Sequence, residues 1–200
     1  MCNLYKLNRT AAEMAQLFRA IADPGANFAA EVFPGYPGLV IGEGRVRAMT
    51  WGFPLALRGK QGQPLKPKPV NNTRSDKLLG GFWRPSFAAR RCLIPLTAFA
   101  EAEGERGRMT RTWFSLPEVE TMVVAGVWRD SVEWGQVYSM VMTDGCVQMG
   151  PIHDRMPVIL TAETMPVWTD AGEEQALALC QPFEGLLQID RTAEPWAARR

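Results

Sequence analysis

Apolar residues repeat with a helical period near the start of the chain. Across residues 10–21, the apolar positions from Met14 to Ile21 follow the i, i+3, i+4, i+7 spacing of one helix face. Thr10 with Glu13 three residues later matches a capping box, in which each side chain bonds the backbone N–H of the other residue. The pattern predicts one amphipathic helix over this segment.

After residue 28 the periodicity changes to short apolar runs divided by Gly and Pro. Such runs, bounded by turn-forming residues, are typical of strands. We therefore expect the middle of the protein to be rich in β-structure. The predicted strand segments are residues 30–42, 46–54, 92–103, 111–116, 121–128, 136–144 and 156–161.

Three further segments depart from this pattern. Residues 57–72 hold three Pro and two Gly among polar residues, so we expect an exposed, non-helical connection. Residues 161–170 and 171–180 have the pattern of short helices and precede a strand over residues 186–189. The end of the chain, from about residue 192 to residue 200, is expected to be a loose basic tail.

Size and composition fit a single soluble domain over residues 1–200. With 46% hydrophobic and 22% charged residues, the chain can bury one sizeable core. No apolar run reaches the roughly 18 to 20 residues that a membrane span needs, and the first residues do not resemble a targeting segment. The four cysteines show no CxxC pair, which argues against a disulfide framework or a zinc site. We expect a monomeric cytoplasmic protein without metal or cofactor.

Charge is segregated along the chain, although the net charge is only +1. From Arg58 to Arg91, nine basic residues stand against one acidic residue, a net charge of +8, so the remainder carries −7. Such a stretch could attract a polyanion such as nucleic acid. The alternative is a solvated basic loop without a partner.

Candidate catalytic chemistry is limited by the presence of one histidine, His153. A hydrolase that binds zinc through several histidines is excluded. His153 begins an apolar strand-like run and has Asp154 and Arg155 as neighbours, which is typical of an active-site rim. A purely structural histidine at a strand edge is the alternative.

Glu101 and Glu103 share one face if residues 92–103 form a strand. The apolar residues before Glu101 favour burial, and a buried carboxyl has a raised pKa that suits a general acid or base. The alternative is that both carboxylates face solvent.

Cys2 becomes a distinct functional group if Met1 is removed. Its α-amine would then have a reference pKa of roughly 7.7 to 8.0, so a useful fraction is neutral and nucleophilic near pH 7. Such an amine attacks aldehydes, and the neighbouring thiol can close the imine into a thiazolidine. The same pair could instead attack an amide, and a third option is a frayed terminus without function.

Six sequence motifs, in this order, resemble one family. They are "MC" at the start, "TWGFP", "VNNTRSD", "RRCLIPLTAFAE", "AGVW" and "IHDRMPVIL". The combination resembles the SRAP family (SOS response-associated peptidases), whose members process abasic sites in DNA. The resemblance is clearest over residues 2–160.

The resemblance implies an α+β fold, a single domain with a β-barrel-like core of mostly antiparallel strands and a few short flanking helices. It also implies that removal of Met1 exposes a catalytic cysteine and that Pro34 lines the pocket. Four positions depart from the usual pattern: Asn3 stands in place of Gly, Thr97 and Ala98 replace Asp-Gly, and Ala102 replaces an aromatic residue. The implied catalytic residues are Cys2, Asn72, Glu101 and His153, and the implied DNA-binding residues are Arg74, Arg155 and Pro34.

The resemblance thus implies an abasic-site sensor that binds single-stranded DNA and acts at the nucleoid. Cys2 would form a covalent thiazolidine crosslink with the aldehyde of the ring-opened sugar, with strand-cleaving lyase activity as an option. Trp51, Phe53, Trp83 or Phe87 could stack on bases, although core packing is the simpler role for them. The alternative functions are a peptidase or amidase that uses Cys2 as nucleophile and, third, a non-catalytic single-strand binding module.

Overall fold

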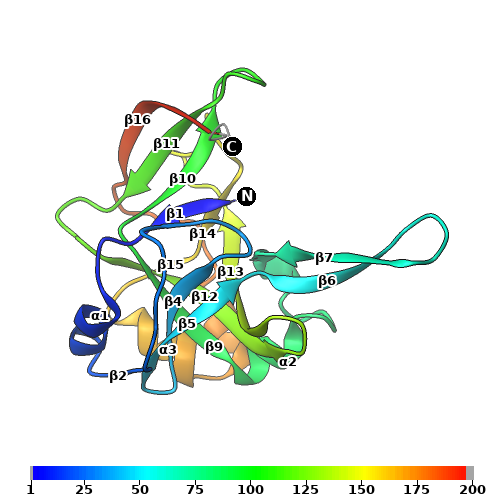
Figure 1. Cartoon of the computed structure of the whole chain (residues 1–200). Coiled ribbons are helices and arrows are strands. Elements are labelled where there is room, and N and C mark those ends of the chain that lie inside the picture. The colour runs from blue at the N-terminus through cyan, green and yellow to red at the C-terminus, as the bar shows by residue number, and fades with distance from the viewer. Residues whose placement is uncertain (1, 197–200) are drawn as a thin grey trace.

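A closed barrel of five strands forms the centre of the protein in the computed structural model, which describes residues 2–196 (Figure 1). Its strands are β4 (Pro37–Gly42), β5 (Arg45–Trp51), β9 (Arg91–Leu96), β12 (Met122–Ser131) and β13 (Gly135–Asp144). Neighbours pair antiparallel in the order β13-β12-β9-β4-β5, and a parallel pairing of β5 with β13 closes the ring. The predicted barrel-like core of mostly antiparallel strands is confirmed.

A second sheet of five strands, in the order β16-β11-β10-β1-β3, packs against the barrel. Only Thr97 separates the end of β9 from the start of β10, so one stretch of chain passes from the barrel into this sheet. Cys2 lies two residues before β1, the strand that pairs with both β10 and β3. The sheet strands are β1 (Leu4–Lys6), β3 (Glu31–Val32), β10 (Ala98–Glu103), β11 (Thr110–Ser115) and β16 (Gln188–Pro195).

Short elements surround these two sheets. The strands β8 (Asn72–Arg74) and β14 (Arg155–Pro157) lie on either side of the C-terminal part of β13, which brings two chain segments about 80 residues apart to one place. A 3-10 turn, Ser75–Lys77, follows β8. The remaining elements are α1 (Ala11–Leu17), α2 (Arg84–Ala89), α3 (Thr164–Asp170), α4 (Glu173–Ala178), β2 (Ile21–Ala22), β8 (Asn72–Arg74), β14 (Arg155–Pro157) and β15 (Ile159–Leu160).

Alternating residues of the barrel strands enter two separate cores, because successive side chains of a strand point to opposite faces. In β12, Val124 joins the first core and its neighbour Ala125 joins the second. The first core includes Tyr5 of the second sheet, whereas the second core includes residues of all four described helices: Met14, Phe87, Trp168 and Ala176. The first core therefore fills the barrel, and the helices cover its outside.

A two-stranded arm projects from the body between β5 and β8 (Figure 1). It consists of β6 (Phe53–Arg58) and β7 (Pro64–Val70), which pair antiparallel. The sequence predicts an exposed, non-helical connection here; the exposure is confirmed, but the segment is an ordered hairpin. Three prolines lie within β7, and because proline has no backbone N–H, they suit an edge that pairs with nothing further.

The first helix is shorter than its apolar pattern predicts. The capping box is confirmed: the Thr10 hydroxyl accepts from the Glu13 N–H, and the Glu13 carboxylate accepts from the Thr10 N–H. The helix ends at Leu17 because Arg19 takes a left-handed backbone conformation with φ 50°. Ile21, predicted to lie on the apolar face, instead belongs to β2 and is exposed.

The C-terminal part differs from prediction in its last strand, which was expected over residues 186–189 and is observed as β16 (Gln188–Pro195). The helices over residues 161–170 and 171–180 are confirmed. The tail expected to be loose from about residue 192 is paired with β11 as far as Pro195, while residues 197–200 lie outside the described part of the chain. Within residues 2–196, no helix combines the length and apolar character that crossing a bilayer requires.

Candidate active site

Two adjacent asparagine side chains hold the backbone at Cys2. The Cys2 carbonyl oxygen accepts from Asn71 Nδ2 at 2.9 Å and from Asn72 Nδ2 at 2.6 Å. Asn71 Nδ2 also donates to Asn3 Oδ1 at 3.1 Å, so the departure at Asn3 is accommodated by a hydrogen bond. Asn72 Oδ1 is buried and has no hydrogen-bond partner among the described residues, which leaves an acceptor next to the start of the chain.

The Cys2 thiol lies in the barrel core. The side chain is fully buried, and Sγ lies 3.4 Å from the Leu4 carbonyl oxygen. Burial raises the pKa of the thiol well above its usual range, and the nearby Glu101 carboxylate raises it further. These contacts belong to Cys2 with Met1 still before it in the sequence. In this arrangement the thiol is protonated at neutral pH.

Glu101 supplies a buried carboxyl beside Cys2. It lies in β10, opposite Thr112 of β11, and only 3% of it is exposed. Burial raises its pKa to about 7, and the Asp154 carboxylate contributes in the same direction. A carboxyl with this pKa can take up and release a proton near neutral pH, so the buried alternative for Glu101 is the one the structure has.

His153 is held in one tautomer by the backbone that follows it. Its Nδ1 accepts from the Arg155 N–H at 2.9 Å, so a neutral ring carries its proton on Nε2. Asp154 Oδ1 lies 3.1 Å from the same nitrogen and would favour a charged ring. Burial outweighs this attraction and lowers the pKa of His153 below its usual value. His153 is therefore neutral near pH 7 and has an N–H to donate.

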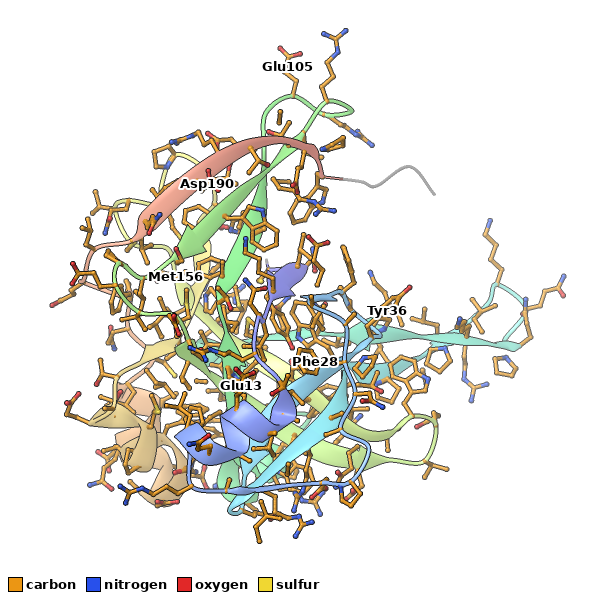
Figure 2. All side chains as sticks on the ribbon, turned by 60° about the vertical axis from the view of Figure 1, so that its left-hand side comes forward. Glu13, Phe28, Tyr36, Glu105, Met156 and Asp190 are labelled. Carbon is orange, nitrogen blue, oxygen red and sulfur yellow. The ribbon has the colours of Figure 1, made fainter. Side chains whose placement is uncertain are left out.

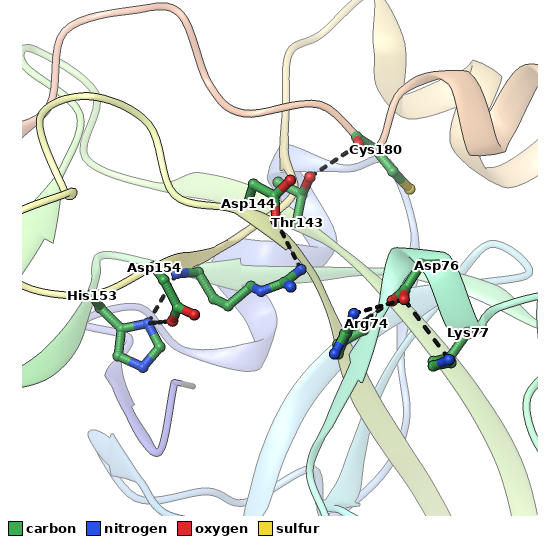
Figure 3. Close-up of polar contacts among 9 residues, drawn as sticks. Arg74, Asp76, Lys77, Thr143, Asp144, His153, Asp154 and Cys180 are labelled. Carbon is green, nitrogen blue, oxygen red and sulfur yellow. Dashed lines mark hydrogen bonds and ion pairs between the residues drawn. The ribbon is translucent and has the colours of Figure 1, made fainter.

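Arg74 and Arg155 each hold a carboxylate on opposite sides of β13 (Figure 3). Arg74 donates through Nε and Nη2 to the two carboxylate oxygens of Asp76, at 2.9 and 2.7 Å. Arg155 Nη1 lies 3.0 Å from Asp144 Oδ1, and these two residues face each other across β13 and β14. Arg155 also lowers the pKa of Asp76, although the Arg74 hydrogen bonds are the main cause. The two ion pairs therefore form one cluster.

These contacts bring six of the seven predicted site residues into one neighbourhood. Asn72 touches Cys2, the charge of Glu101 acts on Cys2, and Asp154 acts on Glu101 and His153. Arg74 and Arg155 belong to the same neighbourhood through the ion-pair cluster that they form with Asp76 and Asp144. Pro34 lies in the turn between β3 and β4, whose Gly35 N–H donates to Trp51 O at 2.7 Å. Sequence reasoning missed Asn71, Asp76, Asp144 and Asp154, although three of the four adjoin predicted residues or lie in the same motif.

A layer of aromatic side chains supports this neighbourhood from the barrel side. Trp51 packs edge-on against Tyr5 and parallel to Tyr138, and its Nε1 donates to Asn71 O at 2.8 Å. This bond fixes the backbone from which Asn71 and Asn72 project.

The four aromatics considered for base stacking are buried in the core. Trp51, Phe53 and Phe87 have no exposed surface, and Trp83 has 8%. The stacking role considered for them is therefore wrong. Two other aromatics have exposed faces, Tyr36 at 50% and Phe82 at 42%, and Tyr36 lies near the root of the arm (Figure 2).

The basic stretch from Arg58 to Arg91 does not form one positive patch. Arg84 and Arg90 lie 3.8 and 3.3 Å from the acidic residues Glu173 and Asp130. The Arg91 guanidinium donates to backbone carbonyls at the ends of α2 and α3, where it caps the helices. Within this described stretch, the cations that have neither an ion pair nor a helix-capping role are those of the arm: Arg58, Lys60, Lys66 and Lys68.

Comparison with known proteins identifies the family and the fold. A family model described as SOS response associated peptidase (SRAP) matches residues 1–193. A solved protein from Bordetella bronchiseptica has TM-score 0.80 at 22% identity, covering 96% of this chain and 99% of that chain. A protein from Bacteroides thetaiotaomicron has TM-score 0.78 at 18% identity, covering 95% and 91%. A phage-related protein from Bordetella bronchiseptica has TM-score 0.67 at 16% identity, covering 96% and 94%. At these identities the structures establish the shared fold.

Proposed function

The chain belongs to the SOS response associated peptidase (SRAP) family, and from this premise we propose that it captures abasic sites in single-stranded DNA through a covalent bond to Cys2. One observation carries the proposal. The backbone of Cys2 is clamped by Asn71 and Asn72 beside Glu101, a carboxyl whose pKa is about 7. An aminothiol at this position would have a proton carrier next to it, as condensation with an aldehyde requires.

The proposed reaction has three steps after removal of Met1. The α-amine of Cys2 adds to the aldehyde carbon of the ring-opened abasic sugar and gives a carbinolamine. Loss of one water gives an imine. The Cys2 sulfur then adds to the imine carbon, its proton passes to the nitrogen, and a thiazolidine ring closes. The net change is two new bonds to the former aldehyde carbon and one water released.

Each polar group of the site has a role that its geometry supports. Glu101 takes a proton from the attacking amine and returns it to the departing hydroxyl, which requires a pKa near neutrality. Asn72 Oδ1, the buried acceptor, orients the amine. The Nε2–H of His153 donates to the sugar hydroxyl or a phosphate oxygen.

Arg74 and Arg155 would bind phosphates on either side of the lesion. Arginine offers a planar fork of donors that matches two phosphate oxygens, and such contacts position a strand without reading its bases. The arm ends at Val70, directly before Asn71 and Asn72, and carries four cations. Selectivity then comes from the aldehyde, which an intact nucleotide lacks.

The proposal is tested with purified protein from which Met1 has been removed, mixed with single-stranded DNA that contains one abasic site. A denaturing gel should show a shifted band that is absent with intact DNA. The competing function is an amidase with the same nucleophile. No shifted band from the processed protein, together with hydrolysis of amide substrates that depends on Cys2, would favour the amidase and reject our proposal.

Neutralising the arm is expected to weaken DNA binding without a base preference. Lys66→Gln with Lys68→Gln should reduce affinity for single-stranded DNA about three- to tenfold at low salt and flatten the salt dependence, because each lost phosphate contact lowers the slope by about 0.7. Affinity measured by fluorescence anisotropy at several salt concentrations gives both quantities.

A matched control for the arm is available in the second sheet, to which the arm does not belong. Arg106 and Arg108 lie in the exposed β10–β11 turn, which Glu105 marks at the top of Figure 2, apart from the arm on the right. Arg106→Gln with Arg108→Gln removes the same charge there. If both double variants lose equal affinity, the arm has no specific role and only net charge matters.

A further inference from the structure

Both arginines that the proposed function assigns to phosphates already bind a carboxylate. The Arg74–Asp76 pair is a two-pronged fork, with both carboxylate oxygens engaged. That arrangement uses the donors that would otherwise grip two phosphate oxygens. The Arg155–Asp144 pair occupies Nη1 of the second arginine. A phosphate that takes the same donors of these arginines must displace Asp76 and Asp144 from them.

The carboxylates are placed by local structure. Asp76 lies in the 3-10 turn that follows β8, two residues after Arg74. Asp144 and Arg155 are directly opposite in the antiparallel pairing of β13 and β14, where facing side chains contact each other. Both pairs therefore form without any bound ligand.

The formal charges of the ion-pair cluster around Arg74 and Arg155 sum to zero. Its cations are Arg74, Lys77 and Arg155, and its carboxylates are Asp76, Asp144 and Asp154. All three carboxylates are substantially exposed, with 47%, 74% and 86% of the side chain accessible in that order. Ion pairs this exposed are weak, so a phosphate can replace the carboxylate. Each such exchange makes the free energy of DNA binding less favourable, because an existing ion pair is broken.

We propose that Asp76 and Asp144 compete with DNA phosphates for Arg74 and Arg155, so that intact single strands are held weakly and released. This inference rests on the proposed function. At an abasic site the covalent bond to Cys2 retains the strand, so weak binding of the phosphates hardly reduces its retention there. On intact DNA no covalent bond compensates for the lost affinity, and the protein dissociates. The two carboxylates thereby favour lesions over the large excess of undamaged strand.

The first test measures binding of intact single-stranded DNA. Asp76→Asn and Asp144→Asn, which keep the side-chain shape, should each tighten binding about two- to fivefold. Asp130→Asn is the matched control, because Asp130 is an exposed partner of Arg90 and lies beside the start of β13, whereas Asp144 ends that strand. Equal tightening by all three variants would reduce the effect to net charge and overturn the inference.

A double-mutant cycle identifies the arginine through which Asp76 acts. In an Arg74→Gln background, Asp76→Asn should change the affinity for DNA by less than half of its effect in the parent protein. The reason is that the guanidinium group for which Asp76 and phosphate compete is absent. An unchanged effect of Asp76→Asn in that background would contradict competition for Arg74.

The second test measures abasic-site crosslinking in the presence of intact competitor DNA. The Asp76→Asn, Asp144→Asn double variant should be inhibited at a several-fold lower competitor concentration than the parent protein. If the parent forms no crosslink, the proposed function fails, whereas the affinity test above still decides the competition. If the parent crosslinks and the double variant is equally resistant to competitor, the inference fails while the proposed function stands.

Discussion

Replacing Cys2 with alanine is expected to lower the yield of heat-stable DNA adduct by more than about 100-fold, because removal of an essential nucleophile removes the step that it performs. Alanine keeps the α-amine once Met1 is removed, so the imine can still form but cannot close into a thiazolidine. Borohydride reduction should therefore trap an adduct of Cys2→Ala that is lost without the reductant. The measurement is the fraction of abasic DNA shifted on a denaturing gel, with and without borohydride.

A chain with an uncleavable N-terminal extension is the complementary variant. It keeps the Cys2 thiol, but its α-amine is part of a peptide bond and cannot form an imine. We expect no adduct from this variant with or without borohydride. A stable adduct from Cys2→Ala at the parent yield would contradict the role of the thiol, and a normal adduct from the extended chain would contradict the role of the amine.

Replacing Glu101 with glutamine is expected to slow adduct formation about 100-fold, the lower end of the range for loss of a general acid–base group. Glutamine preserves the size of the side chain but cannot exchange a proton. Because the pKa of Glu101 is about 7, its titration should contribute to the change of the parent rate with pH near neutrality, and Glu101→Gln should lose this contribution and keep only that of the α-amine. Single-turnover rates from pH 5.5 to pH 8.5 measure both effects.

The same substitution should stabilise the fold at higher pH. The pKa of Glu101 is raised in the folded state, because the folded state binds this proton more tightly than the unfolded state does. The parent protein therefore loses stability as pH rises from about 4.5 to about 7. Above pH 7 the deficit amounts to up to about 3 kcal/mol, from 1.36 kcal/mol per unit of pKa. Glu101→Gln lacks this deficit, so its advantage in the free energy of unfolding should grow between pH 5 and pH 8.

Glu103 provides the control on the same strand. Hydrogen bonds from Thr112 and Arg191 lower its pKa, so its contribution to stability is present at higher pH and is lost on acidification, the opposite sign. Glu103→Gln should therefore not gain stability between pH 5 and pH 8. An advantage of Glu101→Gln that is the same at both pH values would show that its carboxyl is not held at a raised pKa.

Local sequence signals predicted the elements that depend on local physics. The capping box at Thr10 and the short continuous apolar run of β12 were sufficient for one helix start and one barrel strand. Ile21 was misassigned because the apolar spacing continues past Arg19, where the backbone turns. The arm was not predicted as a hairpin because three prolines in β7 weaken the strand signal.

The site could be predicted in part, because several of its residues lie in short motifs. Cys2, Asn72, Glu101 and His153 follow from the family resemblance, and their proximity is a property of the fold. The pairing of Asp144 with Arg155 depends on the register of β13 against β14, which the sequence pattern does not specify. Charge counting failed for the same reason, since it could not show that Arg90 faces Asp130 from another element.

The most direct test of the proposed chemistry is the intact mass of the product formed from processed protein and a single-stranded oligonucleotide with one abasic site. We expect one covalent species whose mass equals that of the protein without Met1 plus the oligonucleotide minus one water, with the adduct on the N-terminal peptide that carries Cys2. Absence of this species, or an adduct mapped to a lysine instead of the terminal cysteine, would contradict the proposal.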